Sequence, residues 1–147
     1  MPKIMKSLNS ISRCQSIYRA EQLPCDLCAC HHTFVLAICR NPGRSQEELS
    51  RDICLNKSTV ARTLTQLEER GYVLRIPNPN DKRQLLIYPT NKMQSILPEI
   101  RSITSKWNDL ISDGISPEEM AVFESVLHRM EQSARMLVQS GEGINKK

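Results

Sequence analysis

The chain has 147 residues, of which 39% are hydrophobic, 24% charged and only 4% aromatic. This length suits one domain of ordinary size that needs no disulfides to hold its core, and it excludes a large cofactor-binding enzyme. With so few aromatic residues the core must be built from aliphatic side chains, which favours helices over a β-sandwich. The net charge of +4, concentrated in the first two thirds of the chain, permits nucleic-acid binding.

No stretch approaches the roughly 18 apolar residues that a membrane helix needs, and the first ten residues lack the apolar centre of a signal peptide. We therefore expect a cytoplasmic protein without a membrane partner. The six cysteines are then expected as thiols or metal ligands rather than as structural disulfides. A glycine-rich phosphate loop, a nucleophile elbow and a His-Glu-x-x-His zinc motif are all absent from the sequence, so we do not expect an enzyme.

Hydrophobic spacing predicts a first helix over residues 3–22 and a second over 32–40. Ser45-Gln-Glu-Glu48 has the pattern of a capping box and opens a short third helix. Asn56 is a candidate N-cap for a fourth helix that ends near residue 70, with Gly71 in the position that commonly follows a helix. The apolar residues of this fourth helix, Val60, Leu64 and Leu67, predict its buried face.

Residues 72–76 and 84–88 alternate like strands, and the polar stretch 77–83 between them predicts a hairpin with a basic tip. A long helix is expected from residue 91, with Pro98 kinking or restarting it. Ser116 begins a second capping box and a last helix to residue 138, whose apolar residues recur in steps of three and four as in a helix–helix seam. The predicted fold is mainly α with a small β-hairpin wing.

Short helix, tight turn, longer helix and basic hairpin follow one another in the order of a winged helix-turn-helix. A major groove about 12 Å wide admits one helix, and Arg and Gln side chains can read base edges while hydroxyls and Lys hold phosphates. Basic residues at a hairpin tip suit the narrow minor groove. The predicted DNA-binding residues are Asn56, Lys57, Ser58, Thr59, Arg62, Thr63, Gln66, Lys82 and Arg83. A solvated helix face with no partner is the simpler alternative.

Five segments carry a family pattern. They read Pro-Gly-Arg-Ser-Gln-Glu-Glu-Leu (42–49), Lys-Ser-Thr-Val-Ala-Arg-Thr-Leu (57–64), Leu-Glu-Glu-Arg-Gly-Tyr-Val-Leu-Arg (67–75), Asn-Asp-Lys-Arg (80–83) and Pro-Thr-Asn-Lys (89–92). Gly-Tyr-Val-x-Arg followed by Asp-x-Arg is the most specific part. On these residues the chain resembles the multiple-antibiotic-resistance regulator (MarR) family, and the helical flanks extend the resemblance over nearly the whole chain.

The resemblance implies a homodimer that binds a palindromic double-stranded DNA operator, with half-sites about 10 bp apart. It implies that residues 56–70 are the recognition helix, that Arg83 enters the minor groove, and that Asp81 pairs with Arg75 to hold the wing. A single domain is expected, with dimerisation helices at 3–24 and 91–138, a winged lobe at 32–89 and a frayed tail at 139–147. A repressor that an effector, a small molecule among the candidates, releases from DNA is the expected function.

Cysteine and histidine cluster where the first helix gives way to the second. Cys25, Cys28, Cys30, His31 and His32 lie within eight residues, and the family does not predict them. The spacing fits a zinc site, an iron–sulfur cluster with a further ligand such as Cys14, a thiol redox switch, or simple packing. In the first two cases the cluster would be the effector site of a metal- or cluster-dependent sensor.

Two predictions remain, for the other cysteines and for the partner of the winged helix. Cys39 and Cys54 are expected to pack in the core as small hydrophobic side chains. A winged-helix module that binds protein rather than DNA is the remote alternative to the regulator. Neutralising Arg62 and Arg83 would separate these functions, because DNA affinity and its salt dependence rest on such cations.

Overall fold

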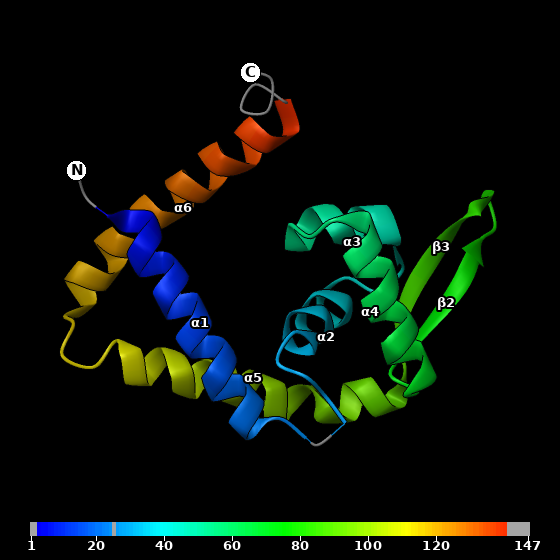
Figure 1. Ribbon diagram of the computed structural model, residues 1–147, viewed down its shortest axis with the longest axis horizontal. Coiled ribbons are helices and arrows are strands. Elements are labelled where there is room, and N and C mark those ends of the chain that lie inside the picture. The colour runs from blue at the N-terminus through cyan, green and yellow to red at the C-terminus, as the bar shows by residue number, and fades with distance from the viewer. Residues whose placement is uncertain (1–2, 25, 141–147) are drawn as a thin grey trace. The chain divides into compact units, whose positions relative to one another are not determined.

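The computed structural model describes residues 3–24 and 26–140, which contain six helices and a three-stranded sheet (Figure 1). In chain order the elements are α1 (Ile4–Gln22), α2 (His31–Arg40), β1 (Arg44–Ser45), α3 (Gln46–Ile53), α4 (Lys57–Glu69), β2 (Val73–Asn78), β3 (Asp81–Pro89), α5 (Asn91–Ile111) and α6 (Pro117–Ser140). Contacts divide the chain into two compact units, residues 1–107 and residues 108–147. The mainly α fold with a small β wing is confirmed.

The starts of the helices follow local hydrogen bonding, as the sequence predicts. The Ser45 hydroxyl accepts from the backbone N–H of Glu48 at 3.2 Å, and the Glu48 carboxylate accepts from the N–H of Ser45 at 2.8 Å. This reciprocal bond lowers the pKa of Glu48. The Asn56 side chain accepts from the N–H of Thr59 at 2.8 Å and so caps α4. Gly71 follows α4 with φ +78°, a conformation that glycine adopts without steric cost.

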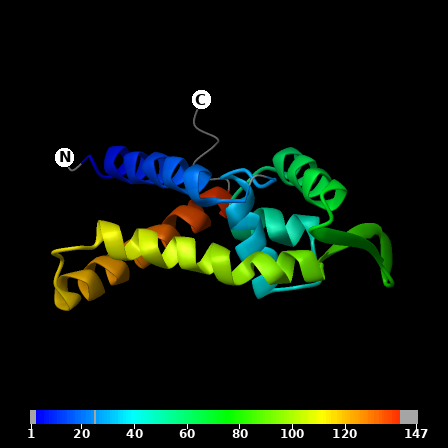
Figure 2. The ribbon, with the colours of Figure 1, turned by 90° about the horizontal axis from the view of Figure 1, so that it is seen from below.

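The sheet has the order β1-β3-β2 and is antiparallel throughout. The sequence did not predict β1, whose two residues pair with Ile87 and Leu86 of β3. The strands β2 and β3 are longer than expected, so that only Pro79 and Asn80 separate them. Lys82 and Arg83 therefore lie within β3 rather than in a loop, in the irregular stretch between the pairs Asn78–Asp81 and Pro77–Leu85. The hairpin extends beyond the helices of the first unit (Figure 2).

The core of the first unit is aliphatic and lies between α2, α3, α4, the sheet and α5. Phe34 is 1% exposed, and the three predicted core residues of α4 are fully buried. The largest fully buried side chains also include Tyr72, Ile38, Leu49, Ile87, Met93 and Ile100. The helix α5 continues through Pro98 without restarting, so a second helix start there is wrong. The prediction that Cys54 packs in the core is wrong, because this residue is exposed in a left-handed conformation at the end of α3. Cys39 packs against the core, as predicted.

The second unit consists of the end of α5 and the helix α6. Ser116 and Glu119 form the predicted capping box, in which Ser116 N–H donates to the Glu119 carboxylate at 2.9 Å. The helix α6 runs to Ser140, past the expected end at 138; the remainder of the predicted frayed tail lies outside the described residues. The helix has no buried residue. None of the helices in the described ranges has the length and hydropathy of a bilayer span.

Candidate nucleic-acid interface

The exposed face of α4 carries most of the predicted DNA-binding residues. Asn56, Lys57, Ser58, Arg62 and Gln66 are exposed and Thr59 is half-buried. The Ser58 hydroxyl donates to Asn56 Oδ1 at 2.9 Å, so the first turn is ordered by its own side chains. The face offers hydroxyl, amide and guanidinium groups to solvent, which are the groups that contact phosphates and base edges in DNA complexes.

Thr63 does not belong to this face, contrary to the prediction. Its side chain is only 7% exposed and lies between Val60 and Leu67 in the buried stripe of α4. Positions 60, 63, 64 and 67 are spaced by three and four residues, and such positions share one side of a helix. The polarity of threonine concealed this in the sequence, because the pattern was judged from the strongly apolar residues alone.

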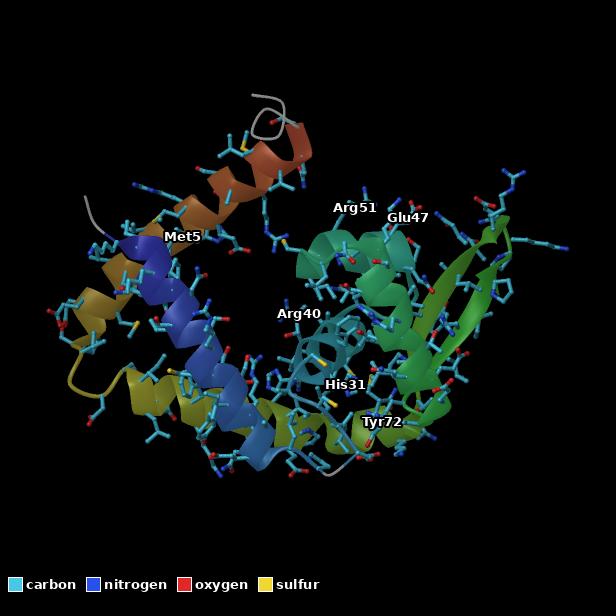
Figure 3. The ribbon with its side chains drawn as sticks, viewed as in Figure 1. Met5, His31, Arg40, Glu47, Arg51 and Tyr72 are labelled. Carbon is cyan, nitrogen blue, oxygen red and sulfur yellow. The ribbon has the colours of Figure 1, made fainter. Side chains whose placement is uncertain are left out.

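A small cavity of about 190 Å³ lies between the start of α3, the start of α4 and the hairpin. Its lining residues are Ser45, Gln46, Glu47, Lys57, Arg83, Gln84 and Leu85. Lys57 and Arg83 bring two cations to this cavity from different elements. Lys57 Nζ lies 3.4 Å from Glu47 Oε1, in an ion pair that is largely exposed to solvent. Glu47 and Arg51 lie on the outward side of α3 (Figure 3).

Arg75 holds the base of the hairpin, but with a different partner from the one predicted. Its Nε donates to Glu68 Oε2 at 2.7 Å, and its terminal nitrogens reach Glu68, Thr65 and Gln46. Asp81 instead accepts from the backbone N–H of Arg83 at 3.1 Å. Arg75 pairs with Ile87 across the sheet, whereas Asp81 lies at the tip opposite Asn78, three residues or about 10 Å further along β2. The predicted Asp81–Arg75 pair is therefore wrong.

His31 links the segment before α2 to the exposed face of α4, which the sequence did not reveal. Figure 3 shows His31 at the start of α2, and its side chain is fully buried. The N–H of Cys28 donates to His31 Nδ1 at 3.1 Å, and His31 Nε2 lies 3.3 Å from Gln66 Oε1. Because Nδ1 accepts a hydrogen bond, Nε2 carries the hydrogen and donates to Gln66. Burial lowers the pKa of His31, which keeps the ring neutral.

Asp26 ties the same segment to the base of the hairpin and to α5. Its carboxylate accepts from the Tyr72 hydroxyl at 2.7 Å and from Lys92 Nζ at 3.2 Å, and its carbonyl accepts from Arg70 at 2.6 Å. Lys92 also lies 4.2 Å from the centre of the Tyr72 ring. The Tyr72 hydroxyl and then Lys92 lower the pKa of Asp26, while burial and Asp26 raise the pKa of Tyr72 to about 12.

The described members of the cysteine–histidine cluster differ in exposure. Cys28, Cys30 and Cys14 are exposed, whereas both histidines are buried, and Cys25 lies outside the described residues. Within residues 3–24 and 26–140, no group of three or more potential ligand side chains is close enough to hold one metal ion. A zinc ion or an iron–sulfur cluster therefore finds no ligand set in this part of the chain.

His32 of α2 is bonded to α5 and lies near enough to Arg19 of α1 to be affected by its charge. His32 is fully buried, and its Nε2 lies 2.8 Å from the Thr104 hydroxyl. In the described part of the chain, two buried side-chain atoms have no hydrogen-bond partner, His32 Nδ1 and Arg19 Nε. Burial, and then the charge of Arg19, lower the pKa of His32 to about 4. Tyr18, next to Arg19 on α1, packs against Trp107 of α5 with ring centres 5.3 Å apart and ring planes tilted by 44°.

Comparisons with known proteins agree on one family. The sequence model of the MarR family matches residues 32–85. The chain is 27% identical over 134 residues to the HTH-type transcriptional regulator YybA of Bacillus subtilis, covering 90% of this chain and 89% of that one.

Solved structures show the same fold. A SlyA-like transcription regulator from Listeria monocytogenes superposes with a TM-score of 0.92 at 24% identity, over 100% of this chain and 99% of that chain. A second regulator from that organism, of the MarR family and complexed with 26mer DNA, has a TM-score of 0.90 at 24% identity over the same shares.

Proposed function

The chain belongs to the MarR family of DNA-binding transcriptional regulators, and from this premise we propose that it is a homodimeric repressor that a small anionic ligand releases from a palindromic operator. The family and the relatives are regulators, and this chain is not an enzyme. The observation that carries the proposal is the exposed polar face of α4 beside two hairpin cations, Lys82 and Arg83. Three further steps support it.

The first step is the reading of DNA. Arg62 and Gln66 lie one turn apart on the exposed side of α4, where they can contact base edges in a major groove. Arg83 lies on the projecting hairpin and supplies the minor-groove contact. Lys57 and the hydroxyls at the start of α4 bind the intervening phosphates. Each helix reads one half-site, so two copies read a palindrome.

The second step is the dimer. The helix α6 has no buried residue although it carries many large apolar side chains. Val126, Met130 and Leu137 line a shallow surface groove on one side of α6 and are 41%, 37% and 53% exposed. An apolar helix face of this kind is buried in a stable protein, and a second copy of the same helix offers the complementary surface. We therefore assign this face to the dimer interface.

The third step is release from DNA. Arg19 and His32 each present a buried polar atom without a partner, which costs free energy unless a ligand supplies one. A guanidinium beside a neutral imidazole favours a small anion. The residues come from α1 and α2, and Thr104 adds a hydroxyl from α5. A ligand held between these helices would change how the dimerisation helix α1 packs and so the separation of the two α4 helices.

The DNA step is tested by selecting duplexes from a random pool with the purified protein and measuring their affinity at several salt concentrations. We expect Arg62→Ala to weaken binding by about 1–3 kcal/mol and to relax the sequence preference. We expect Arg83→Ala to weaken binding and to lower the salt slope by about 1. Arg40→Ala removes an exposed arginine outside α4 and the hairpin and serves as the matched control. Unchanged affinity in both test variants would overturn the proposed interface.

The ligand step is tested separately, without DNA, by thermal unfolding in the presence of small carboxylates and phenolates. A ligand of this class should raise the melting temperature of the wild type but not of Arg19→Gln. His32→Gln, which keeps a polar group in place, should reduce the shift. If a carboxylate or phenolate stabilises Arg19→Gln as much as the wild type, the site lies elsewhere.

A further inference from the structure

Two exposed thiols lie next to the hydrogen bonds that reach α4. Cys28 and Cys30 are both exposed and separated by one residue, and the Cys28 side chain lies near enough to raise the pKa of the Cys30 thiol. The backbone N–H of Cys28 is bonded to the fully buried His31, which is bonded in turn to Gln66 on α4. A change at this thiol pair is therefore two hydrogen bonds away from the face of α4.

We propose that Cys28 and Cys30 form a two-sulfur binding site for monosubstituted trivalent arsenicals, whose occupation disturbs the bond from His31 to Gln66. The ligand class follows from the number of donors. Among the described residues, which do not include Cys25, no third ligand side chain lies at these thiols, and His31 uses both ring nitrogens in hydrogen bonds. Zinc requires about four ligands, whereas an arsenic that already carries one carbon substituent is satisfied by two sulfurs.

The raised pKa of Cys30 favours ligand exchange over oxidation by peroxide. Burial and the neighbouring thiol of Cys28 raise the pKa of Cys30. Hydroperoxides react with thiolates, so a protonated thiol responds slowly to them. With phenylarsine oxide two As–S bonds form and the arsenic–oxygen bonds break. Both thiol protons leave with the oxygen as one water molecule, and arsenic stays trivalent, so no oxidant is needed.

Closing this ring changes the backbone at Cys28. The chelate fixes the segment from Cys28 to Cys30, and the N–H of Cys28 must then change its bond to His31 Nδ1. His31 is buried and neutral, so it cannot exchange a lost partner for water without a cost. Its Nε2–H bond to Gln66 is therefore expected to shift as well. The binding site does not depend on the proposed function, whereas its effect on DNA binding does.

The test uses the full reduced protein and phenylarsine oxide, with thiol counting, native mass spectrometry and 15N NMR of the Gln66 side-chain amide. We expect one arsenical to consume two thiols, to resist a monothiol and to be removed by a dithiol. In a Cys25→Ser background, Cys28→Ser and Cys30→Ser should each weaken capture by about 100-fold, because only one sulfur then remains at the site. Cys14→Ser and Cys54→Ser, which remove exposed single thiols, should bind as the wild type does.

The NMR measurement separates the site from its coupling to α4. The Gln66 amide signals should move on binding in the wild type, and His31→Asn should capture the arsenical yet leave these signals in place. Undiminished capture by Cys28→Ser or Cys30→Ser in the Cys25→Ser background, or loss of both thiols only through a disulfide, would overturn the site. An unmoved Gln66 signal in the saturated wild type would overturn the coupling, and none of these readouts involves DNA.

Discussion

The winged lobe (residues 32–89) and the helix α6 place their apolar side chains in opposite ways. The two phenylalanines of the chain show the difference, since Phe34 in α2 is 1% exposed and Phe123 in α6 is 51% exposed. The lobe closes its core within one chain, around Phe34, Leu49 and Leu64. The helix α6 has comparable hydrophobicity but no buried residue. Stability of the lobe is therefore a property of the single chain, whereas α6 depends on what covers it.

The largest expected effect separates the two phenylalanines. Phe34→Ala leaves a cavity in a closed core and should lower the free energy of unfolding by about 3–5 kcal/mol. Phe123→Ala removes the same side chain from an exposed position and should change the unfolding of the monomer by about 0.5 kcal/mol or less. Urea denaturation at a protein concentration low enough to keep monomers measures both. Equal losses would show that α6 is covered within the single chain.

A charge on the α6 groove should weaken the proposed dimer and leave the lobe folded. Met130→Asp places a carboxylate on the apolar face and should raise the dimer dissociation constant by about 100-fold, or about 3 kcal/mol. Gln139→Asp puts the same charge on the opposite side of the helix and is the control. Sedimentation velocity gives the dissociation constants, and circular dichroism checks the fold. Dimers of undiminished stability in Met130→Asp would place the interface elsewhere.

The junction between the lobe and α1 should be sensitive to pH through His32. Its pKa is about 4 in the folded protein against an ordinary value of 6.5, so as the pH falls through this window the unfolded chain takes up the proton first. Stability is present above about pH 6.5 and is lost towards pH 4, by up to about 3 kcal/mol. Unfolding measured at pH 7.5 and pH 5 should show the loss, and His32→Gln should reduce it.

Carboxylates do not account for a loss of stability between pH 7.5 and pH 5. The pKa values of Asp26 and Glu48 are lowered below 3.8 and 4.5, so their contributions disappear only as the pH falls further. His31 acts in the same direction as His32, because its pKa is also lowered. A His32→Gln variant with the same pH dependence as the wild type would therefore assign the loss to His31 or to other groups.

The sequence predicts the ends of helices correctly where one or two neighbouring residues determine them. The capping boxes at Ser45 and Ser116, the N-cap Asn56 and the glycine at 71 all determine helix ends through one or two hydrogen bonds or one backbone angle. The residues involved are close in sequence, so their geometry follows from spacing alone.

Hydrogen bonds between residues distant in sequence could not be predicted. His31 bonds to a residue 35 positions away, and Tyr72 bonds to one 46 positions away. Nothing in the local pattern distinguishes a histidine that bonds to a distant helix from one that binds a metal. Thr63 was misplaced for a related reason, since a hydroxyl on the inner stripe resembles one on the outer stripe until the packing is known.

Removing the partner of Arg75 has the smallest expected effect, and it tests directly whether Glu68 or Asp81 holds the hairpin. The Arg75 side chain is 18% exposed and Glu68 is 39% exposed, so solvent screens part of their attraction. Glu68→Ala should therefore lower the free energy of unfolding by about 1 kcal/mol, with faster amide exchange in β2 and β3. Asp81→Ala removes the carboxylate that the family pattern assigns to Arg75, but it loses only a bond at the tip and should cost about 0.5 kcal/mol or less. A larger loss of unfolding free energy in Asp81→Ala than in Glu68→Ala would show that Asp81 holds the hairpin. The tip carboxylate is the more costly one to lose only if it bonds to Arg75.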